Sequence, residues 1–262
     1  MSPVIKKEVT KDLKAVISEA VSELGGWPKF VKAGEVVMLK PNFNTADPFP
    51  ASSDPWFIKA VVELFYEQKA KLVMIGESST MSLNTRKIME ARGLFKLLEM
   101  ETPPRIYVFE EREWVKKEIP QGQYLKSVSL PEILERVDKL ILLPCLKTHS
   151  QAQFTGSLKL SVGFMKPFER VTMHLSHLQE KIAELNKIIH PALIIMDARK
   201  CFINKGPAKG ELVEPNLILV STERVAIDIE GIKIIKSYKG NSLSKIDPEE
   251  LPQIKKAIEY SV

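Results

Sequence analysis

Basic and histidine side chains gather in one part of the sequence, residues 143–174, LPCLKTHSQAQFTGSLKLSVGFMKPFERVTMH. Lysine and arginine bind anions, and histidine transfers protons near neutral pH or binds metals. The segment contains Lys147, Lys159, Arg170, His149 and His174. These residue types predict a site for a carboxylate or phosphate compound, with Lys159, His149 and His174 as candidate catalytic residues and Lys147 and Arg170 as ligand-binding residues.

Further polar side chains come at the ends of other apolar runs, each typical of a buried strand. The runs are EVVMLKPN, KLVMIGESS and PALIIMDAR. Their candidate ligand-binding residues are Lys40, Asn42, Glu77, Ser78 and Asp197. Because the carboxyl ends of parallel strands lie on one side of an open sheet, where ligands bind, we expect these residues to share one crevice with residues 147–149.

Small residues complete the predicted set of ligand-binding residues. They are Thr155, Gly156 and Gly206. Glycine allows the backbone to approach a ligand closely. The loop GPAKGE at 206–211 has no Lys-Ser/Thr ending of a P-loop, but its backbone N–H groups could face an anion.

Several of these residues have a second interpretation. His149 and His174 are candidate ligands of a divalent metal, and Glu77 or Asp197 would complete a mixed nitrogen and oxygen site. Alternatively, Glu77 caps a helix, Asp197 holds a loop through an Asx turn and His149 is a structural histidine. Their joint placement at one crevice favours a functional site.

Two other polar residues fall on predicted helices. Asp228 interrupts the apolar helix ERVAIDIEG. An unpaired buried carboxylate costs several kcal/mol, so we expect a lysine or arginine from another strand end as its partner. His177 lies three residues after His174, and we expect it at the surface.

The elements that position these residues alternate between apolar strands and amphipathic helices. This order predicts an α/β fold with a mostly parallel sheet, helices on both faces, and a small antiparallel excursion around residues 103–130. We expect one domain over residues 1–262. The predicted strands are 35–42, 71–79, 138–144, 191–199 and 216–221. The predicted helices are 10–24, 54–70, 84–99, 131–137, 177–189, 223–237 and 247–262.

Composition narrows the classes of protein. The 38 Lys and Arg and 33 Asp and Glu side chains are interleaved, and no nucleic-acid-binding motif is present, so we expect no nucleic-acid partner. No apolar run approaches the roughly 18 residues of a membrane span, and no signal core is present, which predicts a cytoplasmic protein. Cys145 and Cys201 are expected to be buried, and two separated cysteines cannot hold an iron–sulfur cluster.

Seven ordered motifs carry a family resemblance. They are VMLKPN, GES, LPCLKTH, FTGSLKLSVGF, ERVTMH, MDA followed by GP and G, and STERVAID. From about residue 35 onward the chain resembles the domain of unknown function 362 family, whose members are uncharacterised α/β proteins often associated with ferredoxin-type modules. The resemblance implies a prokaryotic protein and, as a candidate partner, a separate ferredoxin-type protein.

Residues 156–161, GSLKLS, also show a faint similarity to a segment of the nickel-pincer lactate racemases. The similarity would place Lys159 at the lysine that carries their cofactor and His174 at a metal-binding histidine. The racemases have a base histidine after their second strand, whereas this chain has GESSTMS there.

The sequence thus predicts an enzyme that acts on a small anionic compound. Lys40, Lys147, Lys159 and Arg170 would repel one another unless an anionic ligand, or acids such as Glu77, compensated them. The alternatives are a non-catalytic module that binds an anion or a metal-containing cofactor, and a racemase-like enzyme. A homodimer is a candidate assembly.

Overall fold

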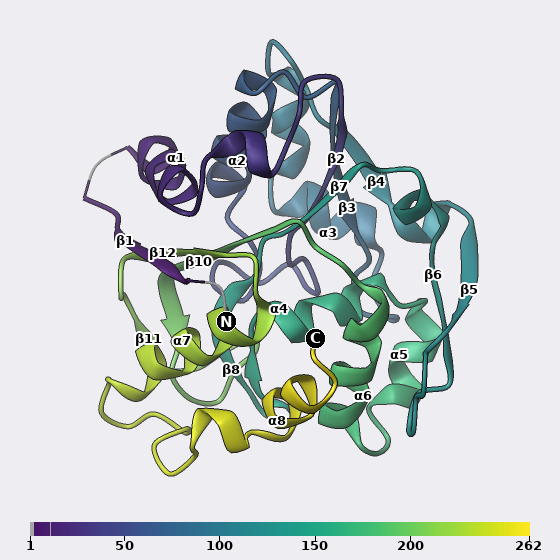
Figure 1. Cartoon of the computed structure of the whole chain (residues 1–262), viewed down its shortest axis with the longest axis vertical. Helices are drawn as coiled ribbons and strands as arrows, with labels where there is room; N and C mark the ends of the chain where they lie inside the picture. Colours follow the sequence, from purple (N-terminus) through teal and green to yellow (C-terminus); the bar gives the residue numbers. More distant parts are fainter. Residues whose placement is uncertain (1–2, 11) are drawn as a thin grey trace.

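A ten-stranded sheet forms the centre of the computed structural model, which describes residues 3–10 and 12–262 (Figure 1). Its main path runs in the order β1-β12-β10-β7-β2-β3-β4, and β8 (Cys145–His149), β9 (Gln153–Thr155) and β11 (Leu212–Val213) are paired off this path. The strands of the path are β1 (Ile5–Glu8), β2 (Val36–Lys40), β3 (Leu72–Glu77), β4 (Arg105–Val108), β7 (Lys139–Leu142), β10 (Leu193–Phe202) and β12 (Leu217–Ser221). The strands from β10 to β4 are parallel, while β1 and β12 are antiparallel additions at one edge. The predicted α/β fold with a mostly parallel sheet is confirmed.

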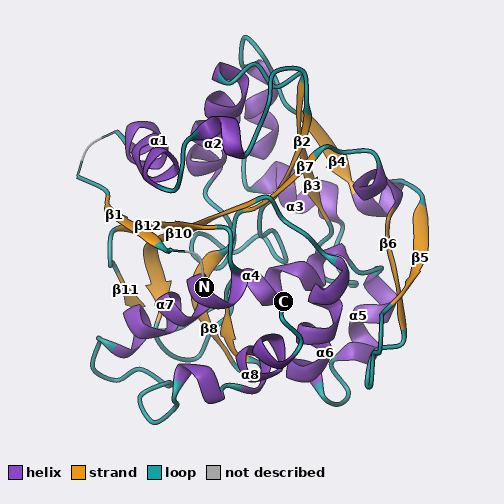
Figure 2. Cartoon of the chain, viewed as in Figure 1, coloured by secondary structure: helices purple, strands orange, loops and turns teal. Residues whose placement is uncertain are grey.

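Helices cover both faces of the sheet, as predicted (Figure 2). Successive strand residues point to opposite faces, and β2 shows the consequence. Val37 and Leu39 belong to one apolar cluster with residues of α1 and α2, whereas Met38 belongs to a second cluster with residues of α4, α6 and α7. The helices are α1 (Leu13–Glu23), α2 (Pro55–Glu67), α3 (Thr85–Ala91), α4 (Ser157–Leu160), α5 (Pro167–Met173), α6 (Leu178–Leu185), α7 (Arg224–Lys236) and α8 (Pro252–Glu259).

Three predicted helices differ from the structure. The helix expected at 84–99 ends at Ala91 and continues as a 3-10 helix from Leu94, because Gly93 takes the left-handed conformation with φ 77°. The helix expected at 247–262 is split, since Pro252 has no N–H to continue the Pro248–Glu250 turn and instead begins α8. Residues 132–135 form a single 3-10 turn.

The predicted small antiparallel excursion is present. β5 (Trp114–Glu118) and β6 (Ser127–Pro131) form a separate two-stranded antiparallel sheet, which lies at one side of the molecule in Figure 1. β4, expected in the same excursion, instead joins the main sheet in parallel with β3.

Two strand ends were also predicted wrongly. Residues 145–149 form a strand of their own, β8 (Cys145–His149), which pairs with β9 (Gln153–Thr155), so Lys147 lies inside a strand. β10 continues to Phe202 because it pairs with β12, with β8 and with β11 (Leu212–Val213), so Asp197 also lies inside a strand.

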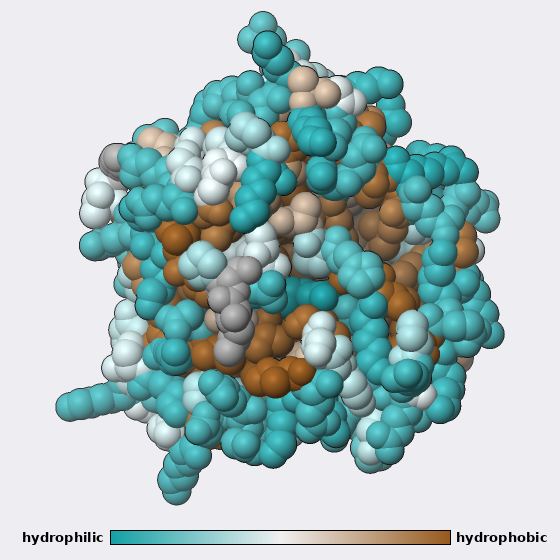
Figure 3. All heavy atoms as spheres, in the orientation of Figure 1, coloured by the Kyte–Doolittle hydropathy of each residue, from teal (hydrophilic) through white to brown (hydrophobic). Residues whose placement is uncertain are grey.

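Most of the face seen in Figure 3 is hydrophilic, and hydrophobic residues show mainly in the recesses between elements. Cys145 and Cys201 are buried and unpaired, as predicted. Among the described residues, none of the helices has the length and apolar character needed to cross a membrane.

Candidate functional site

A pocket of about 480 Å³ lies at the carboxyl ends of β2 and β3, with α4 and α5 on its other side; we name it the β2–α5 pocket. Nine of the thirteen residues predicted for the site line it. They are Lys40, Asn42, Glu77, Ser78, His149, Thr155, Lys159, Arg170 and His174. The sheet edge therefore collects side chains that are far apart in the sequence, as the strand-end argument predicts.

The other four predicted residues lie outside this pocket. The Lys147 ammonium is buried and donates to the carbonyl oxygen of Pro50 at 3.1 Å and to that of Ala51, so it holds the loop after β2. A side chain at Gly206 would meet the Thr148 carbonyl oxygen at 2.1 Å. Gly206 therefore packs against β8, while Gly156 and Asp197 have the structural partners described below.

Lys40 and Glu77 form a buried ion pair, with Nζ to Oε1 at 2.5 Å and side chains 1% and 2% exposed. Glu77 also accepts hydrogen bonds from the Phe43 and Ser78 N–H groups at 2.7 and 2.8 Å. Burial lowers the pKa of Lys40, and the Glu77 carboxylate opposes that shift. Gly163 makes room for this pair, since a Cβ there would lie 2.7 Å from Lys40 Nζ. The Lys40 charge is thus compensated within the protein.

Lys159 lies on α4 and lines the pocket. Its ammonium group forms no hydrogen bond or ion pair with residues 3–10 and 12–262. Burial, with contributions from the Lys147 and Arg170 charges, lowers the pKa of Lys159 to about 8. Most Lys159 side chains are therefore protonated at pH 7, and a bound anion would favour that form further.

Asp228 fixes the start of α4. Its carboxylate accepts hydrogen bonds from the Ser157 N–H at 2.6 Å and the Leu158 N–H at 3.0 Å. The prediction that a lysine or arginine from another strand end pairs with Asp228 is wrong. The partners are backbone N–H groups at the start of α4, because the first N–H groups of a helix have no acceptor within the helix. A Cβ at Gly156 would lie 2.3 Å from Asp228 Oδ1, so this position requires glycine.

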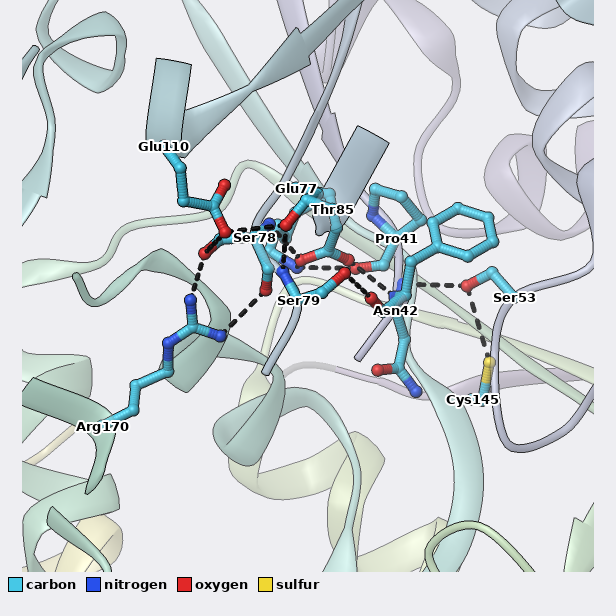
Figure 4. Close-up of polar contacts among 12 residues, drawn as sticks. Pro41, Asn42, Ser53, Glu77, Ser78, Ser79, Thr85, Glu110, Cys145 and Arg170 are labelled. Carbon is cyan, nitrogen blue, oxygen red and sulfur yellow. Dashed lines mark hydrogen bonds and ion pairs between the residues drawn. The ribbon is translucent and has the colours of Figure 1, made fainter. Parts of the chain in front are cut away.

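Arg170 of α5 enters the pocket without contacting a carboxylate. Its Nη1 donates to the Ser78 carbonyl oxygen at 2.9 Å and its Nη2 to the Ser78 hydroxyl, which donates to Glu110 Oε1 at 2.7 Å (Figure 4). Burial lowers the pKa of Arg170, against the opposing effect of Glu77 and Glu110. The buried Arg170 Nε and Thr155 Oγ1 have no hydrogen-bond partner in the part of the chain that the structure describes. Such atoms are rare in folded proteins and mark sites where a ligand or water belongs.

The two histidines of the pocket are held in opposite tautomers. His149 Nδ1 accepts from the Gln151 and Ala152 N–H groups, both at 3.1 Å, so the proton of the neutral ring is on Nε2. His174 Nδ1 lies 2.6 Å from the Arg170 carbonyl oxygen, which can only accept, so Nδ1 carries the proton and Nε2 has a free lone pair. His149 therefore offers the pocket an N–H donor, and His174 offers it a base.

Both histidines are neutral near pH 7. Burial, then the Lys159 charge, lowers the pKa of His149 to about 2. Burial also lowers the pKa of His174, although the hydrogen bond to the Arg170 carbonyl partly offsets the effect. A neutral histidine can accept a proton, as general-base catalysis requires.

The donor set does not fit a metal centre held by protein ligands alone. No group of three or more His, Cys, Asp or Glu side chains suited to a metal ion occurs among residues 3–10 and 12–262. To bind a metal through Nε2, neutral His149 would need its proton on Nδ1. Nδ1 already accepts hydrogen bonds from two backbone N–H groups, so a proton there would clash with these donors. Of the two histidines of the pocket, only His174 has a ring nitrogen, Nε2, with a lone pair for a metal.

His177 is exposed and stacks on Tyr124 with 4.2 Å between ring centroids, in agreement with the predicted surface position. The sequence interpretation missed several residues of the pocket. They include Asn44, Thr80, Met81, Gln151, Val171 and Leu175. No local pattern of the sequence marks them; Val171 and Leu175, for example, have the residue types of a core.

The family model described as domain of unknown function (DUF362) matches residues 37–233. The thylakoid-associated protein sll1697 of Synechocystis sp. is 26% identical over 254 residues, which cover 92% of this chain and 72% of that protein.

Two solved structures are also similar. A Thermotoga maritima protein, Northeast Structural Genomics Consortium target VR152, has a TM-score of 0.45 at 14% identity, covering 81% of this chain and 56% of that one. The lactate racemase apoprotein from Thermoanaerobacterium thermosaccharolyticum has a TM-score of 0.43 at 13% identity, covering 86% of this chain and 51% of that one. The chain thus spans about half the length of each of these structures.

Proposed function

The chain belongs to the DUF362 family, as its ordered motifs predict, and we propose that it is an enzyme that binds a small carboxylate or phosphate compound in the β2–α5 pocket and moves a proton of that compound. The observation that carries the proposal is a pair of cationic side chains, Lys159 and Arg170, that line one pocket and form no ion pair with a carboxylate of the described residues. Arg170 is only 8% exposed. Since an uncompensated buried charge is unfavourable by several kcal/mol, an anionic ligand would stabilise the pocket.

The unpartnered polar atoms support the same ligand class. Arg170 Nε and the Thr155 hydroxyl have no hydrogen-bond partner among the described residues, and the Nε2–H group of neutral His149 is a further donor at the pocket wall. Donors that converge around two positive charges suit the oxygens of a carboxylate or phosphate group.

The proton-transfer step uses His174 as the base. Its Nε2 lone pair takes a proton from the bound compound, a new N–H bond forms, and the electron pair of the broken bond stays on the compound. Lys159 and Arg170 stabilise the added negative charge. Such electrostatic stabilisation is effective when the charged groups are already fixed in place before the reaction. The proton then returns from Nε2 to the same compound or to its product.

Binding is tested first, by thermal unfolding in the presence of phosphate, pyrophosphate and short 2-hydroxy and 2-oxo acids. A ligand at about 100 times its Kd stabilises the native state by about 2.7 kcal/mol, which raises Tm measurably. Lys159→Met and Arg170→Met should lose this increase, and Lys71→Met, a change of an exposed lysine outside the pocket, should keep it. A panel that leaves Tm unchanged would contradict the proposal.

Catalysis is tested by deuterium incorporation into the stabilising compounds in D₂O, followed by NMR. His174→Asn keeps a donor near the position of Nδ1 for the Arg170 carbonyl but removes the Nε2 base, so it should bind the compound and lose exchange. His149→Asn keeps an acceptor for the two backbone N–H groups but removes the Nε2–H donor. It is the matched variant that tests this donor, and it should bind the compound more weakly. Binding without exchange in the unmodified protein would indicate a non-catalytic anion-binding module instead.

A further inference from the structure

Exposed apolar side chains are concentrated near the β2–α5 pocket. Nine large hydrophobic side chains are exposed among the described residues, and five of them come from two segments, 81–83 and 168–175. Isolated exposed hydrophobic residues are ordinary, whereas a group of them beside a pocket marks a contact surface. Both segments contribute to the lining of the pocket.

Three of the five side chains line the pocket itself, and we name them the apolar rim: Met81, Val171 and Leu175. They are 52%, 43% and 77% exposed. Arg170 and His174 are four residues apart, as are Val171 and Leu175, and the turns of α5 continue through the hydrogen bonds His174 N to Val171 O and Leu175 N to Thr172 O. One helical segment thus gives the pocket a polar stripe and, beside it, an apolar stripe.

From this arrangement we infer that the compound bound in the pocket is amphipathic, with an anionic group at Lys159 and Arg170 and an aliphatic or aromatic part against the apolar rim. The inference rests on the proposed function, whose ligand class it narrows. A wholly polar anion would leave the rim in water, whereas an attached apolar group would remove both surfaces from water.

The occupant is a free small molecule. Arg170 and Thr155 are each 8% exposed, so an anionic group must enter the pocket to reach them. The volume of about 480 Å³ is in the range of small-molecule sites and accommodates an anionic group together with part of an attached chain.

The experiment measures the Kd of a series of alkyl phosphates, from methyl to octyl, by calorimetry below their micelle concentrations, with inorganic phosphate as reference. Burial of each methylene is expected to tighten binding by roughly two- to fourfold until the chain passes the rim. The ratio of the methyl to the octyl Kd should therefore be well above tenfold. A ratio near one would overturn the inference.

Variants locate the effect. Val171→Ser and Leu175→Ser together should lower the methyl-to-octyl ratio at least several-fold, and both residues are exposed enough for the fold to tolerate the change. Leu98→Ser, which changes a 44% exposed leucine outside the pocket, is the matched control and should leave the ratio unchanged. An equal ratio in the double variant and the control would contradict the role of the rim.

Two further outcomes separate the possibilities. If no alkyl phosphate and none of the phosphates and organic acids of the thermal-unfolding panel binds, the proposed function itself fails. If the organic acids bind but no alkyl phosphate does, or if all alkyl phosphates bind with one Kd, only the inference of an amphipathic ligand fails. Vesicles that contain phosphatidic acid provide the last arm. Vesicle binding that depends on Val171 and Leu175, without a chain-length dependence for free alkyl phosphates, would assign the rim to a membrane surface and overturn the inference.

Discussion

Arg199 and Arg170 are two arginines at the same sheet, and they differ in what surrounds them. Arg199 donates to Asp197 at 2.9 and 2.7 Å and to Asp54 at 2.8 Å. These carboxylates raise the pKa of Arg199 against the effect of burial. Within residues 3–10 and 12–262, the Arg170 guanidinium donates hydrogen bonds only to the hydroxyl and carbonyl oxygens of Ser78, and burial lowers its pKa.

The difference separates a structural ion cluster from a candidate binding site. The Asp54, Asp197 and Arg199 cluster completes its hydrogen bonds within the chain and joins β10 to the start of α2. The β2–α5 pocket leaves charge and hydrogen-bonding capacity unfilled at Lys159, Arg170 and Thr155. A buried charge that the protein itself compensates serves the fold, and one that it does not compensate indicates a ligand.

The largest expected effect is the loss of stability when the Asp54, Asp197 and Arg199 cluster is broken. Arg199→Met leaves Asp197, which is 1% exposed, without its cation, so we expect a loss of about 3–5 kcal/mol in the free energy of unfolding. Arg170→Met removes a cation that has no carboxylate contact, and a change of about 1 kcal/mol or less is expected. Urea unfolding of the two variants side by side measures the difference; equal losses would remove the distinction between the two arginines.

An intermediate effect is expected for the residue that supports the pocket from behind. Asp228→Ala deletes both acceptors for the first N–H groups of α4, and about 2 kcal/mol of stability should be lost. Because α4 carries Lys159, anion affinity measured by calorimetry should fall as well.

Asp12→Ala provides the matched control for this helix-start effect. Asp12 caps α1 by accepting from the Ala15 N–H at 3.2 Å, far from the pocket lining. Its loss should cost about 1 kcal/mol without a change in anion affinity. A drop in affinity as large as that of Asp228→Ala would show that the affinity merely follows global stability.

The smallest expected effect is on pH dependence: as pH rises, the stability of the unliganded protein and its affinity for an anion should change in opposite directions. The pKa of Lys159 in the folded protein is about 8, below its ordinary value, so between about pH 8 and 10 the unfolded chain binds more protons than the folded one. Without ligand, stability should therefore rise with pH by about 1 kcal/mol relative to Lys159→Met, about half of what the full pKa shift would give, because Lys159 is partly exposed to solvent in the pocket. Anion affinity should fall over the same range, since Lys159 loses its charge. Parallel trends in stability and affinity would contradict the assignment of Lys159 as the anion-binding cation.

The sequence was most informative where a strand stops at a polar turn. Lys40 follows an apolar run and precedes Pro41, and Glu77 closes the next run, so both were correctly expected at the sheet edge. Asp197 was misplaced because the residues after it, through Phe202, continue β10, in which Cys201 and Phe202 are buried. A carboxylate inside a strand and one at its end have the same local sequence pattern.

Other features of the site depend on contacts that no local pattern encodes. The role of Asp228 is fixed by the start of α4, 70 or more residues away in sequence. Val171 and Leu175 have the residue types of a core, and only the three-dimensional arrangement shows them exposed at a pocket. The edge strand β1 was missed because its four residues, IKKE, carry little apolar signal.

The central claim is that Lys159 and Arg170 await an anion, and a crystal structure of the protein with a stabilising alkyl phosphate or short carboxylate tests it most directly. We predict the anionic group within hydrogen-bond distance of Lys159 Nζ, Arg170 Nε and the Thr155 hydroxyl, with the arginine still on Ser78. An anion bound elsewhere, or a Glu110 carboxylate turned onto Arg170 in place of the ligand, would contradict the account.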